Sequence, residues 1–318
     1  MEYIDVFNGD ADGICALHQL RLAAPHQSGL ITGVKRDIGL LKKVEATAGD
    51  QVTVLDISLD KNREALLSLL AKGVHIQYFD HHFSGELPRS DLLDAHIDTD
   101  ANVCTSLLVN DYLQGDYLAW AVVAAFGDNL FDSARCAAQP LALSDVQLEQ
   151  LAHLGTLLNY NGYGLTVDDL HITPEKLYQE IKPFTDPFLF ISESATYQKL
   201  DDGYRADISQ ARALSPAIED AHVSVISLPD VAWARRVVGV YGNELARSTP
   251  IRAHALLTEL PGGDYRVSVR APLANKAGAD ELCMQFPTGG GRKAAAGINA
   301  LPASMKEAFI SALQNKYS

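Results

Sequence analysis

The sequence predicts an α/β protein whose N-terminal half is built on a mostly parallel sheet flanked by helices. Four short apolar segments typical of buried strands alternate with stretches of helical spacing, a pattern that βαβ units produce. The first, third and fourth segments are each followed directly by a polar or acidic residue, as expected where parallel strands end at one edge of a sheet. These segments are Tyr3–Phe7, Leu30–Val34, Gln51–Leu55 and Val74–Phe79.

The central part of the chain is predicted to be helical, and a break in its periodicity marks a domain boundary. Between residues 182 and 199 the apolar spacing is lost and two prolines occur, which is typical of a linker. We therefore expect a catalytic metal-binding domain at 1–185, a linker region at 186–215 and a smaller domain at 216–318. The expected helices are Ile14–Ala24, Arg63–Leu70, Val103–Leu113, Tyr117–Ala125 and Leu141–Leu158.

Strand patterns return near the C-terminus, so the smaller domain is also expected to be α/β. Its predicted strands are Val223–Leu228, Ala253–Leu260 and Tyr265–Arg270, and the glycine pair Gly262–Gly263 is typical of a hairpin turn between the last two.

The chain is acidic, which limits the kind of nucleic acid it binds. Its 318 residues include 40 acidic and 26 basic ones, giving a formal net charge of −14 at pH 7. Long nucleic acid is bound mainly through many Lys and Arg contacts to phosphates, so a short anionic substrate fits this composition better. We expect a short nucleotide or dinucleotide partner, no long duplex and no membrane. A homodimer is an assembly that the sequence leaves open.

Cysteine usage and the N-terminal sequence indicate a cytoplasmic protein. The four cysteines contain no C-x-x-C pair, which argues against a zinc cage or a disulfide scaffold. The chain begins without a basic region followed by an apolar run, and no uncharged apolar stretch approaches the ~20 residues needed to span a bilayer.

Acidic and imidazole residues follow three of the predicted strands. Because the carboxyl ends of parallel strands meet at one edge, these side chains are expected in one crevice. Neighbouring carboxylates repel one another, and Mn²⁺ or Mg²⁺ relieves that repulsion, with imidazole favouring Mn²⁺. Two such ions ~3.5–4 Å apart stabilise the oxygens of an in-line displacement at phosphorus. The residues are Asp10 and Asp12 after the first strand, Asp56 after the third, and Asp80, His81 and His82 after the fourth.

Each motif taken alone has a simpler explanation. The Asp10–Gly13 segment is also a good helix cap, and it mimics the start of an EF-hand loop. The twelfth position of that loop is Gln19 rather than a bidentate Glu, which argues against calcium. A His-His pair by itself is more often a surface or core feature. The occurrence of all three motifs at strand ends favours the metal site.

A second cluster of interest is the glycine-rich segment near the C-terminus. Gly289, Gly290 and Gly291 allow backbone N–H groups to converge on an anion, and we expect a helix to begin just after them. Arg292 and Lys293 add positive charge, but no Ser or Thr follows the lysine as a Walker A loop requires. Arg270, at a strand end, is a further candidate phosphate ligand. The alternatives are a flexible surface loop and a solvated arginine.

Together these segments resemble the DHH–DHHA1 phosphoesterase superfamily, which includes single-strand exonucleases, oligoribonucleases and phosphatases of bisphosphate nucleotides. Asp10–Gly13 is similar to the first motif, Asp56 to the second and Asp80–His82 to the name-giving third. Ala125–Asn129 resembles the fourth motif, and Gly289–Gly297 resembles the DHHA1 signature. The resemblance covers nearly the whole chain in the correct order.

The resemblance implies two Mn²⁺ ions, with Mg²⁺ as the alternative, in a cleft between two domains. It implies that His82 contacts the scissile phosphate and that Asp80 orients an imidazole. The DHHA1 domain would hold the rest of the substrate. The implied metal ligands are Asp10, Asp12, Asp56, His81 and Asp128.

Two positions depart from the family pattern. Many relatives carry a histidine where this chain has Val6, so Asn8 or water would complete the metal shell. The DHHA1 signature usually has a histidine where Arg292 stands, and an arginine there can fork onto a phosphate or a guanine edge.

The sequence therefore predicts a metal-dependent phosphoesterase. The leading hypothesis is an Mn²⁺-dependent phosphodiesterase that hydrolyses linear dinucleotides or very short oligoribonucleotides to nucleoside 5′-monophosphates. The alternative is a phosphatase of 3′,5′-bisphosphate nucleotides or a polyphosphate or pyrophosphate hydrolase. A non-enzymatic nucleotide-sensing module is disfavoured by the intact ligand motifs.

Overall fold

A five-stranded sheet, parallel throughout, forms the centre of the first unit, Met1–Asp202, in the computed structural model of residues 1–318. The strand order β2-β1-β3-β4-β5 confirms the predicted parallel sheet. The chain moves from β1 to β2 on one side and to β3 on the other, so the carboxyl ends of β1 and β3 flank the topological switch point. The strands are β1 (Tyr3–Phe7), β2 (Gly29–Ile31), β3 (Gln51–Leu55), β4 (His75–Asp80) and β5 (Leu93–Ile97).

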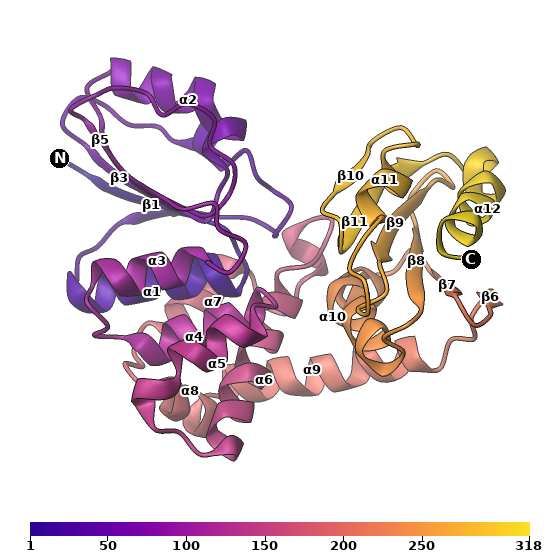
Figure 1. The fold of residues 1–318 in the computed structure, drawn as a ribbon. Helices are drawn as coiled ribbons and strands as arrows, with labels where there is room; N and C mark the ends of the chain where they lie inside the picture. Colours follow the sequence, from indigo (N-terminus) through magenta and orange to yellow (C-terminus); the bar gives the residue numbers. More distant parts are fainter. The chain divides into compact units, whose positions relative to one another are not determined.

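Alternating residues of this sheet face two different helical layers. Val6, Val54 and Tyr78 pack in one apolar cluster with residues of α2 (Leu59–Ala71). The opposite face meets α1 (Ala11–Ala23) and α3 (Thr105–Tyr112), where Phe79 lies 5.2 Å from Tyr112 between ring centroids. Figure 1 shows α2 on one side of the sheet and α1 and α3 on the other.

Two glycines, Gly127 in α4 (Leu118–Gly127) and Gly155 in α6 (Asp145–Asn161), allow close packing of these helices, and Gly127 also lies close to the start of α1. A Cβ atom on Gly127, at the end of α4, would lie 2.4 Å from Cβ of Ala11 and 2.8 Å from the carbonyl oxygen of Gly155. This contact places the residue after α4, Asp128, beside the start of α1. The remaining helices of the unit are α5 (Phe131–Ala137), α7 (Pro174–Ile181) and α8 (Pro187–Glu193).

The division between the two units falls inside a helix. Helix α9 (Ala195–Arg212) crosses the change from Met1–Asp202 to Gly203–Ser318, within the range predicted for a linker. The apolar periodicity is lost between residues 182 and 199 because the helices in this segment are short or largely exposed, and not because the segment lacks secondary structure. None of the helices combines the length and the apolar character needed to span a bilayer.

The second unit, Gly203–Ser318, contains a mixed six-stranded sheet in the order β10-β11-β9-β8-β7-β6. Helices α11 (Ala279–Cys283) and α12 (Lys306–Tyr317) contribute to the apolar cluster on one face, and α10 (Ala232–Ser248) contacts β8 and β9. The strands are β6 (Ile218–Glu219), β7 (Val223–Leu228), β8 (Ala253–Glu259), β9 (Tyr265–Arg270), β10 (Gly289–Gly291) and β11 (Ala295–Leu301).

The glycine-rich segment forms a β-hairpin, so the prediction of a helix directly after it was wrong. Strand β10 pairs antiparallel with β11, with Gly290 opposite Gly297. A Cβ atom on Gly289 would lie 1.8 Å from the carbonyl oxygen of Cys283, and one on Gly291 would lie 2.5 Å from Cα of Ala296. Close backbone approach therefore accounts for these two glycines. Gly290 has open space around its Cα.

We predict that His18 makes folding pH-dependent. Burial lowers its pKa from 6.5 to about 4, although its ring Nε2 lies 2.8 Å from the carbonyl oxygen of Phe184. The unfolded chain therefore binds a proton between these values that the folded chain does not, and stability falls as pH drops from 6.5 towards 4. At pH 5 the loss is about 2 kcal/mol.

Chemical denaturation at pH 7 and pH 5 checks this expectation. His18→Gln keeps a donor but cannot take up the proton, so it should show a smaller pH-dependent loss than the wild type. Equal losses in the two proteins would contradict the assignment.

Candidate metal centre

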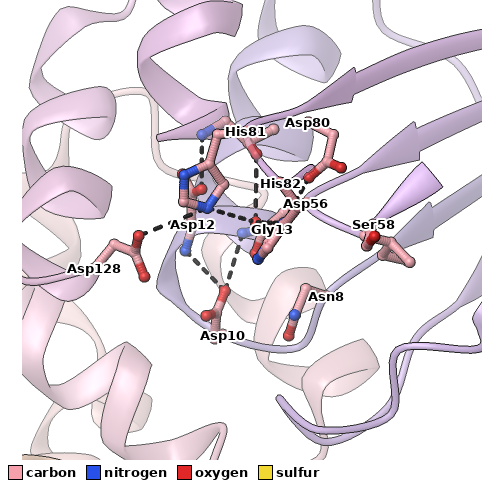
Figure 2. A network of polar contacts seen from close by, with 12 residues as sticks. Asn8, Asp10, Asp12, Gly13, Asp56, Ser58, Asp80, His81, His82 and Asp128 are labelled. Atoms are coloured by element: carbon pink, nitrogen blue, oxygen red, sulfur yellow. Dashed lines mark hydrogen bonds and ion pairs between the residues drawn. The ribbon is translucent and has the colours of Figure 1, made fainter. Parts of the chain in front are cut away.

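The predicted acidic and imidazole residues converge at the carboxyl edge of the first sheet (Figure 2). Asp56 follows β3 and His81 follows β4, and both are buried. Asp10 and Asp12 lie at the start of α1, directly after β1, and Asp128 follows α4. Four separate segments of chain thus supply one cluster at the switch point of the sheet.

Backbone N–H groups hold the two aspartates of the first motif. Asp10 caps α1, and its Oδ1 accepts hydrogen bonds from the backbone nitrogens of Asp12 at 3.0 Å and Gly13 at 3.2 Å. Asp12 accepts from the backbone nitrogens of Thr105 and Ser106, both at 2.7 Å, at the start of α3. Helix N-termini stabilise negative charge, so they fix both carboxylates in place. The helix-cap and cluster interpretations of this motif are compatible.

Asp56 adopts a strained backbone conformation. Its φ of 57° lies in the left-handed region, which costs energy for a residue with a side chain, although Asp tolerates it better than most. The conformation places Oδ1 3.3 Å from the hydroxyl of Thr105 and 3.5 Å from Nε2 of His81. Strain of this kind persists where the surrounding structure requires a particular side-chain direction.

His81 directs one ring nitrogen into the cluster. Its Nδ1 lies 2.8 Å from the carbonyl oxygen of Val103, which only accepts, so Nδ1 carries the proton and donates. The lone pair on Nε2 is then available, and Nε2 lies 3.7 Å from Oδ2 of Asp128. An imidazole oriented in this way by a carbonyl is typical of a metal ligand.

His82 is more exposed than His81 and is held by Asp80. The Nδ1–H of His82 donates to Oδ1 of Asp80 at 2.7 Å. Burial lowers the pKa of His82, but the hydrogen bond to Asp80 and the charge of Asp56 outweigh it, so the pKa is raised overall. The His82 side chain is 38% exposed. Its exposure exceeds that of His81, at 7%, and of Asp128, at 21%.

The carboxylates of the cluster repel one another. Burial first, and neighbouring carboxylates second, raise the pKa of Asp56 well above its usual range. Burial also raises the pKa of Asp12, against the lowering effect of His81. Such a group of buried oxygens with an imidazole lone pair fits a divalent cation, which removes the repulsion. Two sets of three residues each bring their ligand atoms within 4.8 Å of one another. One set is Asp56, His81 and His82, and the other is Asp12, His81 and Asp128.

Lys35 is a member of the cluster that sequence reasoning missed. It lies in the segment after β2, and its Nζ contacts Oδ2 of Asp10 and lies 2.9 Å from Oδ1 of Asn159. Burial raises the pKa of Asp10, but the charge of Lys35 and their hydrogen bond outweigh that effect and lower it overall. The available signal was its position after a strand neighbouring β1. No motif distinguishes this lysine from the others.

The contacts of Asn8 bear on whether it could complete the metal shell. Its Nδ2 donates to the carbonyl oxygen of Lys35 at 3.3 Å, whereas its buried Oδ1 has no hydrogen-bond partner. The side-chain oxygen of Asn8 is therefore available as a metal ligand, at the same edge of the sheet as Asp10 (Figure 2).

The predicted substrate-binding residues all lie in the second unit. Arg270 donates from Nε to Oδ1 of Asn243 at 2.7 Å and from Nη1 to the hydroxyl of Ser268 at 3.0 Å. Arg292 and Lys293 are exposed in the turn between β10 and β11. Arg270, at the end of β9, pairs with Ala295 at the start of β11, the strand that directly follows the turn holding Arg292 and Lys293.

The chain has the fold of the DHH–DHHA1 phosphoesterases, which confirms the fold implied by the motifs. A manganese-bound exonuclease RecJ matches with a TM-score of 0.64 at 17% identity, covering 99% of this chain and 89% of that chain. RecJ from Thermus thermophilus, in complex with Mn²⁺, matches with a TM-score of 0.60 at 18% identity and 99% coverage of this chain. This chain covers 51% of that protein, about half its length.

A third solved structure has the same extent as this chain. The pGpG-specific phosphodiesterase PggH from Vibrio cholerae matches with a TM-score of 0.57 at 11% identity, covering 99% of this chain and 100% of that chain. Identities this low establish the fold and leave the substrate open. No family model and no curated protein sequence matches the chain.

We predict that Asp56→Asn stabilises the metal-free protein and abolishes most of its stabilisation by Mn²⁺. The substitution removes one of the repelling carboxylates, and Asn also tolerates the left-handed backbone at this position. A ligand present at a concentration 100 times its Kd raises the free energy of unfolding by about 2.7 kcal/mol. We expect Mn²⁺ at that concentration to stabilise the variant by less than about 1 kcal/mol.

Thermal unfolding with and without Mn²⁺ measures both effects. Asp91→Asn is the matched control, because Asp91 is exposed and lies outside the cluster. An Asp56→Asn protein that gained as much stability from Mn²⁺ as the wild type would contradict the metal assignment.

Proposed function

We propose that this chain is an Mn²⁺-dependent phosphodiesterase that hydrolyses linear dinucleotides or very short oligoribonucleotides to nucleoside 5′-monophosphates. The observation that carries the proposal is the buried carboxylate and imidazole cluster at the switch point of the parallel sheet, with the partly exposed His82 at its border. Its fold neighbours include a manganese-bound exonuclease and a pGpG-specific phosphodiesterase.

The residues of the cluster have distinct proposed roles. Asp12, Asp56, His81 and Asp128 would hold the divalent cations, which supply Lewis-acid activation and charge stabilisation at phosphorus. We propose Asp10, which is outside both candidate ligand sets and contacts Lys35, as a fifth ligand. His82 binds a phosphoryl oxygen and holds a mobile proton at Nε2, while Asp80 keeps its ring in one tautomer. The proposed catalytic set is thus His82, Asp80 and Asp56.

The substrate is proposed to be short because few groups are available to hold it. The net charge of −14 does not favour a long polyanion. Arg292 and Lys293 are exposed, Arg270 is close by in the sheet, and the backbone of Gly290 is uncrowded. We propose that these residues, with Gly289 and Gly291, bind the remaining phosphate or base of the substrate.

An exposed aromatic residue beside His82 supports a substrate that contains nucleobases. Phe83 follows His82 directly and is 73% exposed. Its loop is nevertheless fixed, because Ser58 donates to the carbonyl oxygen of Phe83 at 3.3 Å and Arg63 donates to that of Glu86 at 2.7 Å. A large apolar ring held in solvent next to the proposed phosphate contact is suited to stacking on a base.

We predict that Phe83→Ala raises KM for dinucleotides by about 5- to 150-fold, since stacking on an aromatic ring contributes roughly 1–3 kcal/mol per base. The variant should keep the wild-type kcat, because the ring would contact a base rather than the reacting phosphorus. Steady-state kinetics on a dinucleotide provide the test, and Leu87→Ala, in the same exposed loop, is the control. An unchanged KM would remove Phe83 from the substrate site.

Hydrolysis of a substrate panel tests the proposed function itself. We expect Mn²⁺-dependent cleavage of 5′-phosphorylated dinucleotides, slower cleavage of longer RNAs, and loss of activity when Mn²⁺ is chelated. Equal turnover of long strands would overturn the short-substrate proposal. Activity on adenosine 3′,5′-bisphosphate or pyrophosphate with inert dinucleotides would favour the alternative phosphatase. Binding without turnover across the panel would favour a nucleotide-sensing module.

A further inference from the structure

The ammonium group of Lys35 lies among the acidic residues that the proposed metal site uses. Its Nζ contacts Oδ2 of Asp10, lies 2.9 Å from Oδ1 of Asn159 and lies 3.5 Å from Oδ1 of Asp128. Its side chain is only 23% exposed. A monovalent cation is therefore built into the cluster at this position.

Lys35 is held there by contacts of its backbone as well as its side chain. The backbone nitrogen of Lys35 donates to the carbonyl oxygen of Gly162 at 2.8 Å, and Asn8 donates to the carbonyl oxygen of Lys35 at 3.3 Å. The ammonium also lies 5.8 Å from the ring centroid of Tyr163. Because neighbouring segments fix it at several points, the lysine is a structural part of the cluster.

The lysine occupies the Asp10 side of the cluster and leaves the His81 side open. Asp128 presents Oδ1 to Lys35 and Oδ2 to His81, at 3.5 Å and 3.7 Å. On the His81 side, Oδ1 of Asp56 and Nε2 of His81 lie 3.5 Å apart, a separation that a shared cation can bridge. On the other side, the Asp10 oxygen that does not cap α1 is already occupied by the ammonium.

We propose that Lys35 is an internal cation that competes with one of two metal ions, so that the two ions bind with very different affinities. One divalent cation binds on the Asp56–His81 side without displacing the ammonium. A second reaches Asp10 only when the Lys35 ammonium leaves it. This inference rests on the proposed metal-dependent function and adds an order of metal loading to it.

The charge of Lys35 sets the expected size of the effect. A hydrogen bond to a charged group contributes enough to change an equilibrium by roughly ten- to a hundredfold. The wild type should therefore bind one Mn²⁺ tightly and a second at least about tenfold more weakly. In Lys35→Met the side chain has similar length and no charge. This variant should bind the second Mn²⁺ more tightly, so that the affinities of the two ions differ less.

Direct Mn²⁺ binding to the metal-free protein, measured by calorimetry and by the electron paramagnetic resonance of free Mn²⁺, tests the proposal without substrate. Lys35→Arg keeps the charge and should keep the wild-type difference. Lys43→Met is the matched control, because Lys43 is exposed and pairs with Asp37 at 2.6 Å, outside the cluster. Asn159→Ala, which removes a second partner of the ammonium, should tighten the second ion in part and provides a test if Lys35→Met fails to fold.

Two equally tight Mn²⁺ sites in the wild type would overturn the proposal, as would a second site unaffected by both Lys35→Met and Asn159→Ala. The outcome is independent of the substrate. A chain that binds Mn²⁺ in this order yet cleaves no dinucleotide would overturn the proposed function alone.

Discussion

Electrostatic repulsion among three buried aspartates is the constraint that the contacts around the site must offset. These aspartates meet at the carboxyl ends of neighbouring parallel strands. Asp10, Asp12 and Asp56 each lose water, and the charges of Asp10 and Asp12 raise the cost of charging Asp56. Peptide N–H groups at the starts of α1 and α3 offset part of that cost for Asp10 and Asp12. Asp56 receives no such helix N-terminus, and its pKa is accordingly raised well above its usual range.

Helix packing serves the same cluster. Helix α4 is almost entirely apolar and buried, so it needs no polar face, and Gly127 lets its end approach Ala11. The aspartate that follows this helix therefore arrives beside the first motif although more than a hundred residues separate them in the chain. A larger residue at Gly127 would push Asp128 outward and weaken the cluster through packing rather than through charge.

Strand periodicity made part of the site predictable from the sequence, whereas tertiary contacts account for the parts that were missed. Strands β1 and β3 and the acidic residues after them were predictable, because parallel strands end at one edge. The glycine-rich segment was misjudged in its local structure, because a glycine required by a neighbouring backbone and one required by an anion look alike in sequence. Lys35 was missed because only its place beside Asp10 distinguishes it from other lysines.

Different hydrogen-bond partners distinguish the two adjacent histidines of the cluster. His81 and His82 lie just beyond the end of β4, and their ring centroids are 4.5 Å apart, but their Nδ1 atoms have different partners. His81 is fixed by a carbonyl oxygen and keeps its free nitrogen towards buried carboxylates, which suits a ligand. His82 is fixed by the buried carboxylate of Asp80 and is the more exposed of the two, which suits a proton carrier. The partner of each Nδ1, a carbonyl oxygen for His81 and a carboxylate for His82, therefore distinguishes the proposed metal ligand from the proposed phosphate contact.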